Sequence, residues 1–310
     1  MLAIFLQTIP FFLIIGLGYG AGRTGFFSEE ATAYLTRFVF YFALSAMLFR
    51  FAANLSLAEV IDWRFIGAYL WGTAVVYVLA AMVAFLRRRG IEEAAFEAQC
   101  AVVGNVGFLG LPMLVILMGD AAAVPVMLVL SVDLIFFGSL VVILVTGARD
   151  GRVSIRTLRT VGMGLVRNPM IMSIALGLGW SALKIPIPAP MNDFLTILGA
   201  AATPGALFAI GASLASKSAE RPFVAGWLSF CKLVLHPGAV AVSALWLFPV
   251  APFPAAVMIA AAAMPVAGNV FILAQHYGVA PLRVSASILI STVLAVVTVS
   301  LVIGWVTMLY

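Results

Sequence analysis

The sequence has very little charge. Asp, Glu, Lys and Arg make up 9% of its 310 residues, whereas soluble domains carry roughly 25%. Hydrophobic residues account for 64% of the chain, and apolar runs of about 20 residues recur along it, each long enough to cross roughly 30 Å of hydrocarbon as a helix. The composition therefore predicts an all-α integral membrane protein in contact with a lipid bilayer, with no room for a separate soluble domain.

Reactive and metal-binding side chains are also scarce. The chain has two cysteines, Cys100 and Cys231, and two histidines, which form neither a disulfide framework nor a metal-ligand spacing. HExxH, GxSxG and P-loop motifs are absent, as is any convergent acidic or His/Cys cluster. We therefore expect no enzyme, no metal site and no cofactor. The lack of a nucleotide motif also argues against a primary pump.

Ten apolar segments are expected to cross the membrane as helices. Their approximate bounds are 3–22, 31–52, 64–86, 94–118, 122–147, 168–184, 194–216, 222–247, 253–276 and 282–308. Each is about the length that a membrane-spanning helix requires.

Basic residues gather on one side of these segments. The loops after segments one, three, five, seven and nine hold thirteen of them: Arg23, Arg37, Arg87, Arg88, Arg89, Arg149, Arg152, Arg156, Arg159, Arg167, Lys217, Arg221 and Arg283. The other side holds three: Arg50, Arg64 and Lys184. Because cytoplasmic loops carry the excess of Lys and Arg, we expect a multi-pass cell membrane protein with both termini outside. The net charge of +5 then reflects topology rather than binding of nucleic acid.

The two halves of the chain resemble each other at a shift of 159 residues. Matching pairs include Pro10 and Pro169, Gly18 and Gly177, Gly20 and Gly179, Gly67 and Gly226, and Gly119 and Gly278. The shift predicts a first five-helix repeat in residues 1–147, a cytoplasmic linker in 148–167 and a second repeat in 168–310. Because five is odd, the second copy enters from the opposite side, and such inverted repeats are typical of secondary transporters.

Two of the expected helices contain residues that interrupt helices. The string GNVGFLGLP at 104–112 lies in the fourth segment, and MPVAGNVFILAQ at 264–275 lies in the ninth. Broken helices in corresponding places of two halves point to a transporter binding site. The half-helix N-termini would attract an anion, and the candidate substrate-binding residues are Asn105, Gly107, Gly110, Pro112, Pro265, Gly268, Asn269 and Gln275. The alternative is that the glycines only permit close helix packing.

Four strings resemble the auxin efflux carrier family, which includes plant PIN exporters and bacterial malate or malonate permease-like carriers. They are GNVGFLGLP, RNPMIMSIALG at 167–177, TPGALFAIGASLA at 203–215 and MPVAGNVFILAQHYG at 264–278. The resemblance implies the fold of bile-acid sodium symporters, with a panel of helices 1, 2, 6 and 7 and a mobile core that carries crossed helices 4 and 9. It leaves a homodimer through the panel open. Asn105 and Pro112 match the helix 4 motif, and Pro265 and Asn269 match that of helix 9.

Three ionisable residues lie at membrane depth and are candidates for ion coupling. Asp133 lies near the middle of the fifth segment and Lys232 near the middle of the eighth. An ion pair between them is geometrically reasonable, and His236 lies one helical turn after Lys232. The resemblance suggests that Lys232 replaces a sodium ion of related symporters. Protonation of Asp133 or His236 would then couple transport to protons, unless the pair is static and fixes only helix packing.

These features favour a secondary carrier of a small organic anion, a carboxylate such as malate, malonate or an auxin-like acid. The mobile core implies alternating access of the elevator type. Two alternatives stay open: a sodium-coupled organic anion symporter, and a channel or sensor on a transporter fold.

Overall fold

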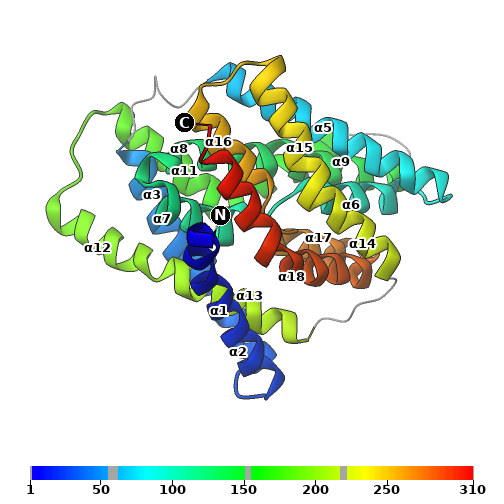
Figure 1. Ribbon diagram of the computed structural model, residues 1–310, viewed down its shortest axis with the longest axis horizontal. Helices are drawn as coiled ribbons and strands as arrows, with labels where there is room; N and C mark the ends of the chain where they lie inside the picture. The colour runs from blue at the N-terminus through cyan, green and yellow to red at the C-terminus, as the bar shows by residue number, and fades with distance from the viewer. Residues whose placement is uncertain (1, 55–61, 151–154, 217–221, 310) are drawn as a thin grey trace.

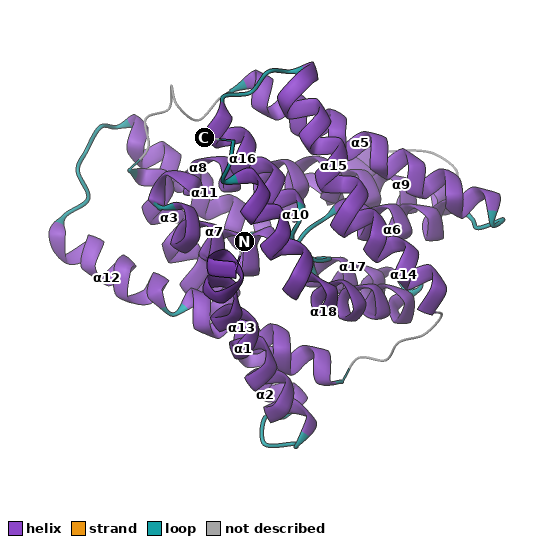
Figure 2. Cartoon of the chain, in the orientation of Figure 1, coloured by secondary structure: helices purple, strands orange, loops and turns teal. Residues whose placement is uncertain are grey.

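The computed structural model describes residues 2–54, 62–150, 155–216 and 222–309. Throughout these residues the chain is helical and forms no strand, as Figure 2 shows. Seven helices are long and apolar enough to cross a membrane, and one bent pair would make an eighth. The expected all-α membrane protein is therefore confirmed. Of the basic residues counted above, Arg152, Lys217 and Arg221 lie outside the described residues.

The helices follow one another with short connections (Figure 1). The first half contains α1 (Leu2–Arg23), α2 (Glu29–Phe38), α3 (Leu44–Ala53), α5 (Trp63–Leu86), α6 (Ile91–Val102), α7 (Leu111–Met118), α8 (Ala123–Val132) and α9 (Gly138–Asp150). The second contains α10 (Ile155–Arg167), α11 (Pro169–Ala182), α12 (Ala189–Ala200), α13 (Ala202–Ala215), α14 (Pro222–Phe230), α15 (His236–Val242), α16 (Pro252–Ala262), α17 (Gly268–Tyr277) and α18 (Pro281–Val306).

Wider turns join several of these helices end to end. They are the π-helical turns η1 (Val39–Ala43), η2 (Val106–Gly110), η4 (Asp133–Phe137), η5 (Cys231–Leu235) and η6 (Ser243–Leu247), and the 3₁₀ turn η3 (Asp120–Ala122). Each apolar segment expected from the sequence is occupied by one helix or by consecutive helices. The fourth and the ninth are interrupted, as their glycines and prolines predict.

Local sequence sets several helix ends. The side chain of Ser28 caps α2 by accepting the amide of Ala31 at 3.1 Å, and Asp62 caps α5 by accepting the amide of Arg64 at 2.9 Å. Such caps satisfy amides that have no partner inside the helix. Gly278 ends α17 in the left-handed conformation, with φ of 66°, which glycine adopts without strain.

The helices form two groups. In the first, α1 packs along α13, α3 packs against α11 and α12, and α2 contacts α13. In the second, α5, α6, α8, α9 and α14–α18 pack around one another. The first group contains the helices that the family resemblance assigns to the panel, and the second those that it assigns to the core. The groups meet where α1 contacts α18, and there the hydroxyls of Thr8 and Ser300 lie 2.6 Å apart.

Two glycines bring helices of the first group into close contact. A Cβ atom on Gly18 of α1 would lie 2.2 Å from the carbonyl oxygen of Phe208 in α13. A Cβ atom on Gly177 of α11 would lie 2.7 Å from the carbonyl oxygen of Phe49 in α3. Both pairs of helices therefore approach at a distance that only glycine permits, as small residues do between membrane helices. The same shift of 159 residues relates Gly18 to Gly177 and Phe49 to Phe208.

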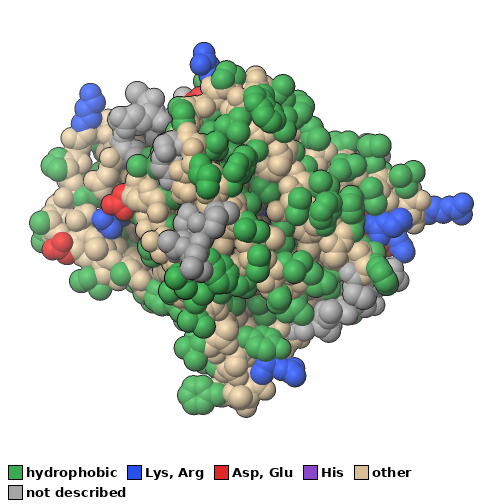
Figure 3. Space-filling view, in the orientation of Figure 1, with side chains coloured by type: hydrophobic (Ala, Val, Ile, Leu, Met, Phe, Trp, Pro, Cys, Tyr) green, Lys and Arg blue, Asp and Glu red, His purple; other side chains and the backbone are tan. Residues whose placement is uncertain are grey.

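The outer surface suits contact with lipid. Figure 3 shows a face covered mostly by apolar side chains, with Lys and Arg at its periphery. Large apolar side chains such as Leu13, Val293 and Ile197 are exposed by 65%, 61% and 75%. An apolar surface of this extent is not stable in water, and lipid tails would cover it.

Ion pairs tie together one end of the second group. The buried carboxylate of Glu97 in α6 accepts hydrogen bonds from Arg87, which follows α5, and from Arg283 in α18. Arg149 of α9 donates to Glu92 of α6 at 2.7 Å. Three of these basic residues come from different elements, so the network fixes the ends of α5, α9 and α18 around α6.

Candidate functional site

The interruptions of the fourth and ninth segments lie against each other. Gly104 and Val266 form an isolated antiparallel bridge. The amide of Asn105 donates to the carbonyl of Pro265 at 2.7 Å, and the amide of Ala267 donates to the carbonyl of Val103 at 3.1 Å. Each break therefore supplies hydrogen-bond partners for backbone groups that the other break leaves free, which a backbone inside a membrane requires.

The crossing has a local twofold relation. Exchanging residues 103–105 with 265–267 converts one of the two hydrogen bonds into the other. This relation pairs Gly104 with Val266, a shift of 162 residues instead of the 159 that aligns the rest of the halves. The sequence thus locates both breaks, whereas their pairing in space differs by three residues from the alignment.

Asn105 presents its side chain at this crossing. Its backbone carbonyl accepts the amides of Leu109 and Gly110 at 3.1 and 2.9 Å and so begins the turn η2. Its side chain is 8% exposed, and within the described residues the side-chain amide makes no hydrogen bond to protein. A buried amide without a partner is costly, so this group is available for a ligand.

The other break leaves the start of α17 open. Gly268 and Asn269 are exposed, and no side chain caps this helix. The first amides of a helix carry a partial positive charge and lack partners within it. Gln275 is also exposed, but it lies six residues beyond Asn269 along α17, about 9 Å at 1.5 Å per residue. The structure thus brings Asn269 to the crossing and leaves Gln275 near the far end of the helix.

The other four candidate binding residues shape the breaks. Gly107 leaves space for the side chain of Met170 in α11, because a Cβ there would lie 2.4 Å from the Met170 methyl carbon. Gly110 lies close to the side chain of Met264. Pro112 is in the first turn of α7, and Pro265 contributes its carbonyl to the crossing. All four are buried.

Lys232 lies directly beneath the crossing. A Cβ atom on Gly104 would lie 3.1 Å from both Cε and Nζ of Lys232, so glycine at this position makes room for the ammonium group. Lys232 and His236 are fully buried. The Lys232 ammonium donates to the carbonyl of Ala262 at the end of α16, and its Nζ lies 3.0 Å from Nδ1 of His236.

Asp133 does not contact Lys232 directly. Within the described residues the two side chains form no ion pair closer than 4 Å, although their charges interact. Instead the buried carboxylate accepts a hydrogen bond from the hydroxyl of Tyr69 at 2.8 Å, while its Oδ2 is buried without a partner. The backbone of Gly104 interacts with Asp133 and approaches Lys232. The break therefore separates the acidic group from the basic one.

Sequence reasoning missed two polar residues of this cluster. Tyr69 binds Asp133, and the hydroxyl of Thr73 lies 3.0 Å from Nε2 of His236. Both are buried in α5. With Tyr77 they recur every four residues, which places three hydroxyl groups on one face of an otherwise apolar helix. That spacing is the signal that would have located them.

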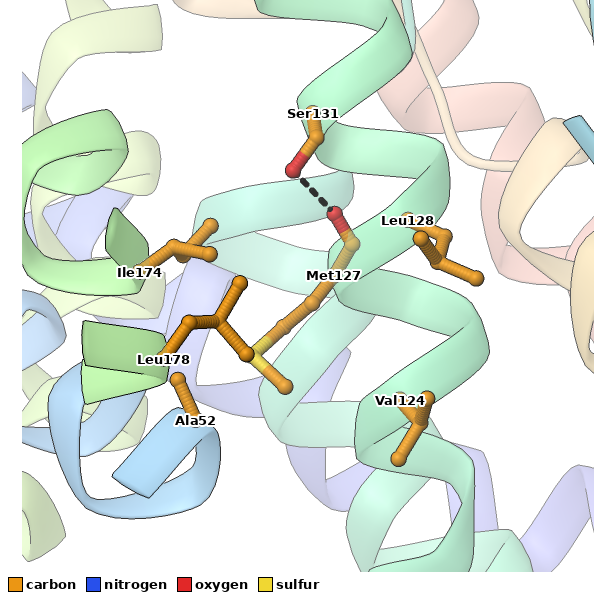
Figure 4. A pocket seen from close by; sticks show the side chains of 7 residues that line it. All are labelled: Ala52, Val124, Met127, Leu128, Ser131, Ile174 and Leu178. Carbon is orange, nitrogen blue, oxygen red and sulfur yellow. Dashed lines mark hydrogen bonds between the residues drawn. The ribbon is translucent and has the colours of Figure 1, made fainter. Parts of the chain in front are cut away.

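A separate apolar cavity lies between the two helix groups. It has a volume of about 120 Å³ and is lined by Ala52, Val124, Met127, Leu128, Ser131, Ile174 and Leu178 (Figure 4). The hydroxyl of Ser131 donates to the carbonyl of Met127 at 2.7 Å, so the one hydroxyl in the lining is satisfied. None of the predicted site residues lines this cavity.

Apolar helices, two paired helix breaks and buried ionisable groups beside them define a membrane transporter. Comparison with known families agrees with this class. A family model described as "Membrane transport protein" matches residues 3–303. The chain therefore belongs to this family, that of the auxin efflux carriers that its motifs resemble.

Two relatives illustrate the range of this similarity. The "Putative malonate transporter" of Rhizobium meliloti (strain 1021) is 32% identical over 298 residues, which cover 94% of this chain and 92% of the relative. The "Lysosomal cholesterol signaling protein" of Mus musculus is 28% identical over 226 residues, which cover 66% of this chain and 25% of the mouse protein. The chain thus spans nearly all of the bacterial relative and about a quarter of the mouse one.

Proposed function

We propose that the chain is a secondary active transporter of a small organic anion, with malonate and related dicarboxylates as the first candidates. The observation that carries this proposal is the crossing of two broken helices above the buried ammonium of Lys232. The name of the rhizobial relative supports the substrate class.

The crossing offers the groups that a carboxylate needs. The side chain of Asn105 and the open start of α17 would donate hydrogen bonds, and Asn269 would add a second side-chain amide. Lys232 supplies positive charge below them. Donors that converge on one place in a low-dielectric surrounding bind an anion more strongly than they would in water.

The fold proposed for this function has ten spans in an inverted five-plus-five repeat. Three observations support it: the glycine contacts related by 159 residues, the local twofold of the crossing, and the separation into two helix groups. In the proposed elevator mechanism, α5–α9 and α14–α18 carry the substrate along the first group. Positive-inside asymmetry places both termini outside the cell membrane.

Proton coupling is the proposed source of energy. Asp133, Lys232 and His236 lie in one buried cluster around the crossing, and each exchanges a proton in ordinary protein chemistry. A change of charge there would alter the anion's affinity for the crossing. Sodium coupling is the alternative, and flux measured in a sodium-free proton gradient distinguishes the two.

Uptake of radiolabelled malonate into proteoliposomes tests the proposal. We expect saturable uptake and counterflow for the intact protein and a loss of at least tenfold in Asn105→Ala. Asn192→Ala, in α12 of the first group, serves as the matched control and is expected to transport normally. Unitary ionic currents without counterflow would identify a channel instead.

A thermal-shift screen of organic acids extends the test to other substrates. An acid that stabilises the intact protein and Asn105→Ala equally would contradict binding at the crossing. Stabilisation of the intact protein alone would identify the substrate class even if malonate itself fails.

A further inference from the structure

The linker expected between the two halves contains a helix. Residues 155–167 form α10, which contacts α9 and α11. Only Asn168 separates it from α11, and the side chain of that residue caps α11 by accepting the amide of Met170 at 2.9 Å. The axes of the two helices meet at 68°. If α11 crosses the membrane, α10 lies closer to the membrane plane than to its normal.

The sequence of α10 is amphipathic. Ile155, Leu158, Gly162 and Val166 recur at intervals of three or four residues and so share one face. Leu158 and Val166 are exposed by 53% and 62%. Packing against α9 and α11 therefore leaves apolar surface uncovered.

The polar residues of α10 are basic. Arg156, Arg159 and Arg167 lie in this helix, and no acidic residue occurs from residue 151 to residue 192. Arg159 and Arg167 are exposed. A helix with an apolar face and a positively charged face is the type that lies in the interface of an anionic bilayer.

We infer that α10 is an interfacial helix that binds anionic phospholipid headgroups. Leu158 and Val166 insert at the level where headgroups meet acyl chains, and the arginines bind lipid phosphates. A single residue tethers α10 to a membrane helix, so the bilayer surface is always within its reach, whereas a soluble partner would have to displace lipid. This assignment rests on the chain being a membrane protein and does not depend on its substrate.

Depth-dependent quenching tests the apolar face. Val166→Cys, labelled with an environment-sensitive fluorophore in the full-length reconstituted protein, is expected to be quenched by lipids with brominated acyl chains and not by aqueous iodide. The lipid-facing control is Val293→Cys in α18, and the aqueous control is Glu30→Cys in α2. Cys100 and Cys231 are buried, and labelling of the unsubstituted protein measures their background.

Hydrogen exchange tests the charged face. Protection of residues 155–167 is expected to be higher in bilayers of phosphatidylglycerol and phosphatidylcholine than in phosphatidylcholine alone. An arginine near an anionic surface contributes about fivefold, so Arg159→Gln with Arg167→Gln should lower this protection by about 25-fold in the anionic bilayer only. Arg88→Gln, a change at another exposed basic residue, is the control. High salt should weaken the effect, because it screens exposed charges.

Three results would overturn the inference. Iodide quenching at position 166 would place the face in water. Quenching by neither reagent would mean that protein covers it. Equal protection in both bilayers would remove the preference for anionic lipid. None of these readouts measures transport, so a failed uptake assay leaves the result for α10 unaffected.

Discussion

At the scale of single residues, Lys232 has the most demanding position in the described chain. Its ammonium is fully buried, and a buried charge is tolerated only with partners. Its nearest polar contacts, His236 and the carbonyl of Ala262, are neutral acceptors. The counter-charge, Asp133, acts from the other side of the Gly104 backbone. This leaves the ammonium group free of a direct ion pair and able to attract an anion.

Substitution of Lys232 should separate stability from function. Lys232→Met keeps the volume but leaves Asp133 without its counter-charge, and we expect a loss of about 3 kcal/mol of folding free energy. The double variant Lys232→Met with Asp133→Asn should recover most of that loss, because neither charge is left unpaired. Melting curves and malonate uptake on both variants are the measurement. Uptake should be absent from both, and normal uptake in the double variant would remove Lys232 from substrate binding.

At the scale of elements, the pairing of the two breaks determines the site. Each break alone would leave backbone groups without partners, and the bridge between Gly104 and Val266 satisfies both at once. The amide of Val266 also donates to the hydroxyl of Ser291 in α18 at 3.0 Å, which connects the crossing to the last helix. The crossing is therefore one structural unit assembled from both halves of the chain.

Adding a methyl group at the crossing should disturb the site. Gly104→Ala places a Cβ 3.1 Å from the Lys232 side chain, which is held by His236 and Ala262 and has little room to move. We expect a loss of about 1–3 kcal/mol in stability and at least a tenfold weaker affinity for the anion, measured by thermal shift and titration. Gly90→Ala, where nothing lies within 4 Å, is the control. Unchanged affinity in Gly104→Ala would show that the ammonium is not held in place by this glycine.

The contact between α1 and α13 provides a second test at this scale. Gly18→Ala would bring a Cβ within 2.2 Å of a backbone carbonyl, which cannot move away as a side chain can. We expect a loss of about 3 kcal/mol, and less only if the helices separate. Gly20→Ala, two residues along the same helix with nothing within 4 Å, should be neutral or stabilising by up to about 1 kcal/mol because alanine favours helices. Equal melting temperatures of the two variants would contradict the close contact.

The sequence predicts much of this architecture because its signals are local. Glycine and proline locate the breaks at 103–105 and 263–267, and hydropathy locates the helices. The partner of each break is not local: the alignment places Asn105 against Met264, whereas the structure pairs its amide with Pro265. Tyr69 and Thr73 were missed because a hydroxyl adds little polarity to an apolar helix. The helix α10 was taken as part of a linker because its hydrophobic face is short and interrupted by arginines.

At the scale of the whole molecule, two helix groups meet along a surface that is not completely filled. The cavity of about 120 Å³ lies on this surface, with Ala52, Ile174 and Leu178 from the first group and the residues of α8 from the second. A dry apolar cavity forgoes packing contacts. Incomplete packing between two bodies is expected where one must slide along the other.

Filling the cavity should slow transport. Ile174→Phe adds volume on the first-group side, and we expect unchanged or higher melting temperature together with a loss of at least tenfold in uptake rate, because the larger ring opposes sliding of α8. Ile197→Phe, exposed by 75% in α12, is the matched control and should have no effect. Uptake at the normal rate in Ile174→Phe would mean that this surface does not move during transport.

The hydrogen bonds that pair the breaks involve only main-chain atoms, which every amino acid except proline supplies in full. Side chains at positions 105 and 269 can therefore be exchanged during evolution without loss of the crossing itself. A gene of this kind acquires a new substrate by few substitutions, since the framework and the recognition groups are inherited separately. Related carriers with the same pair of breaks should then differ in specificity mainly at the side chains directed into the crossing.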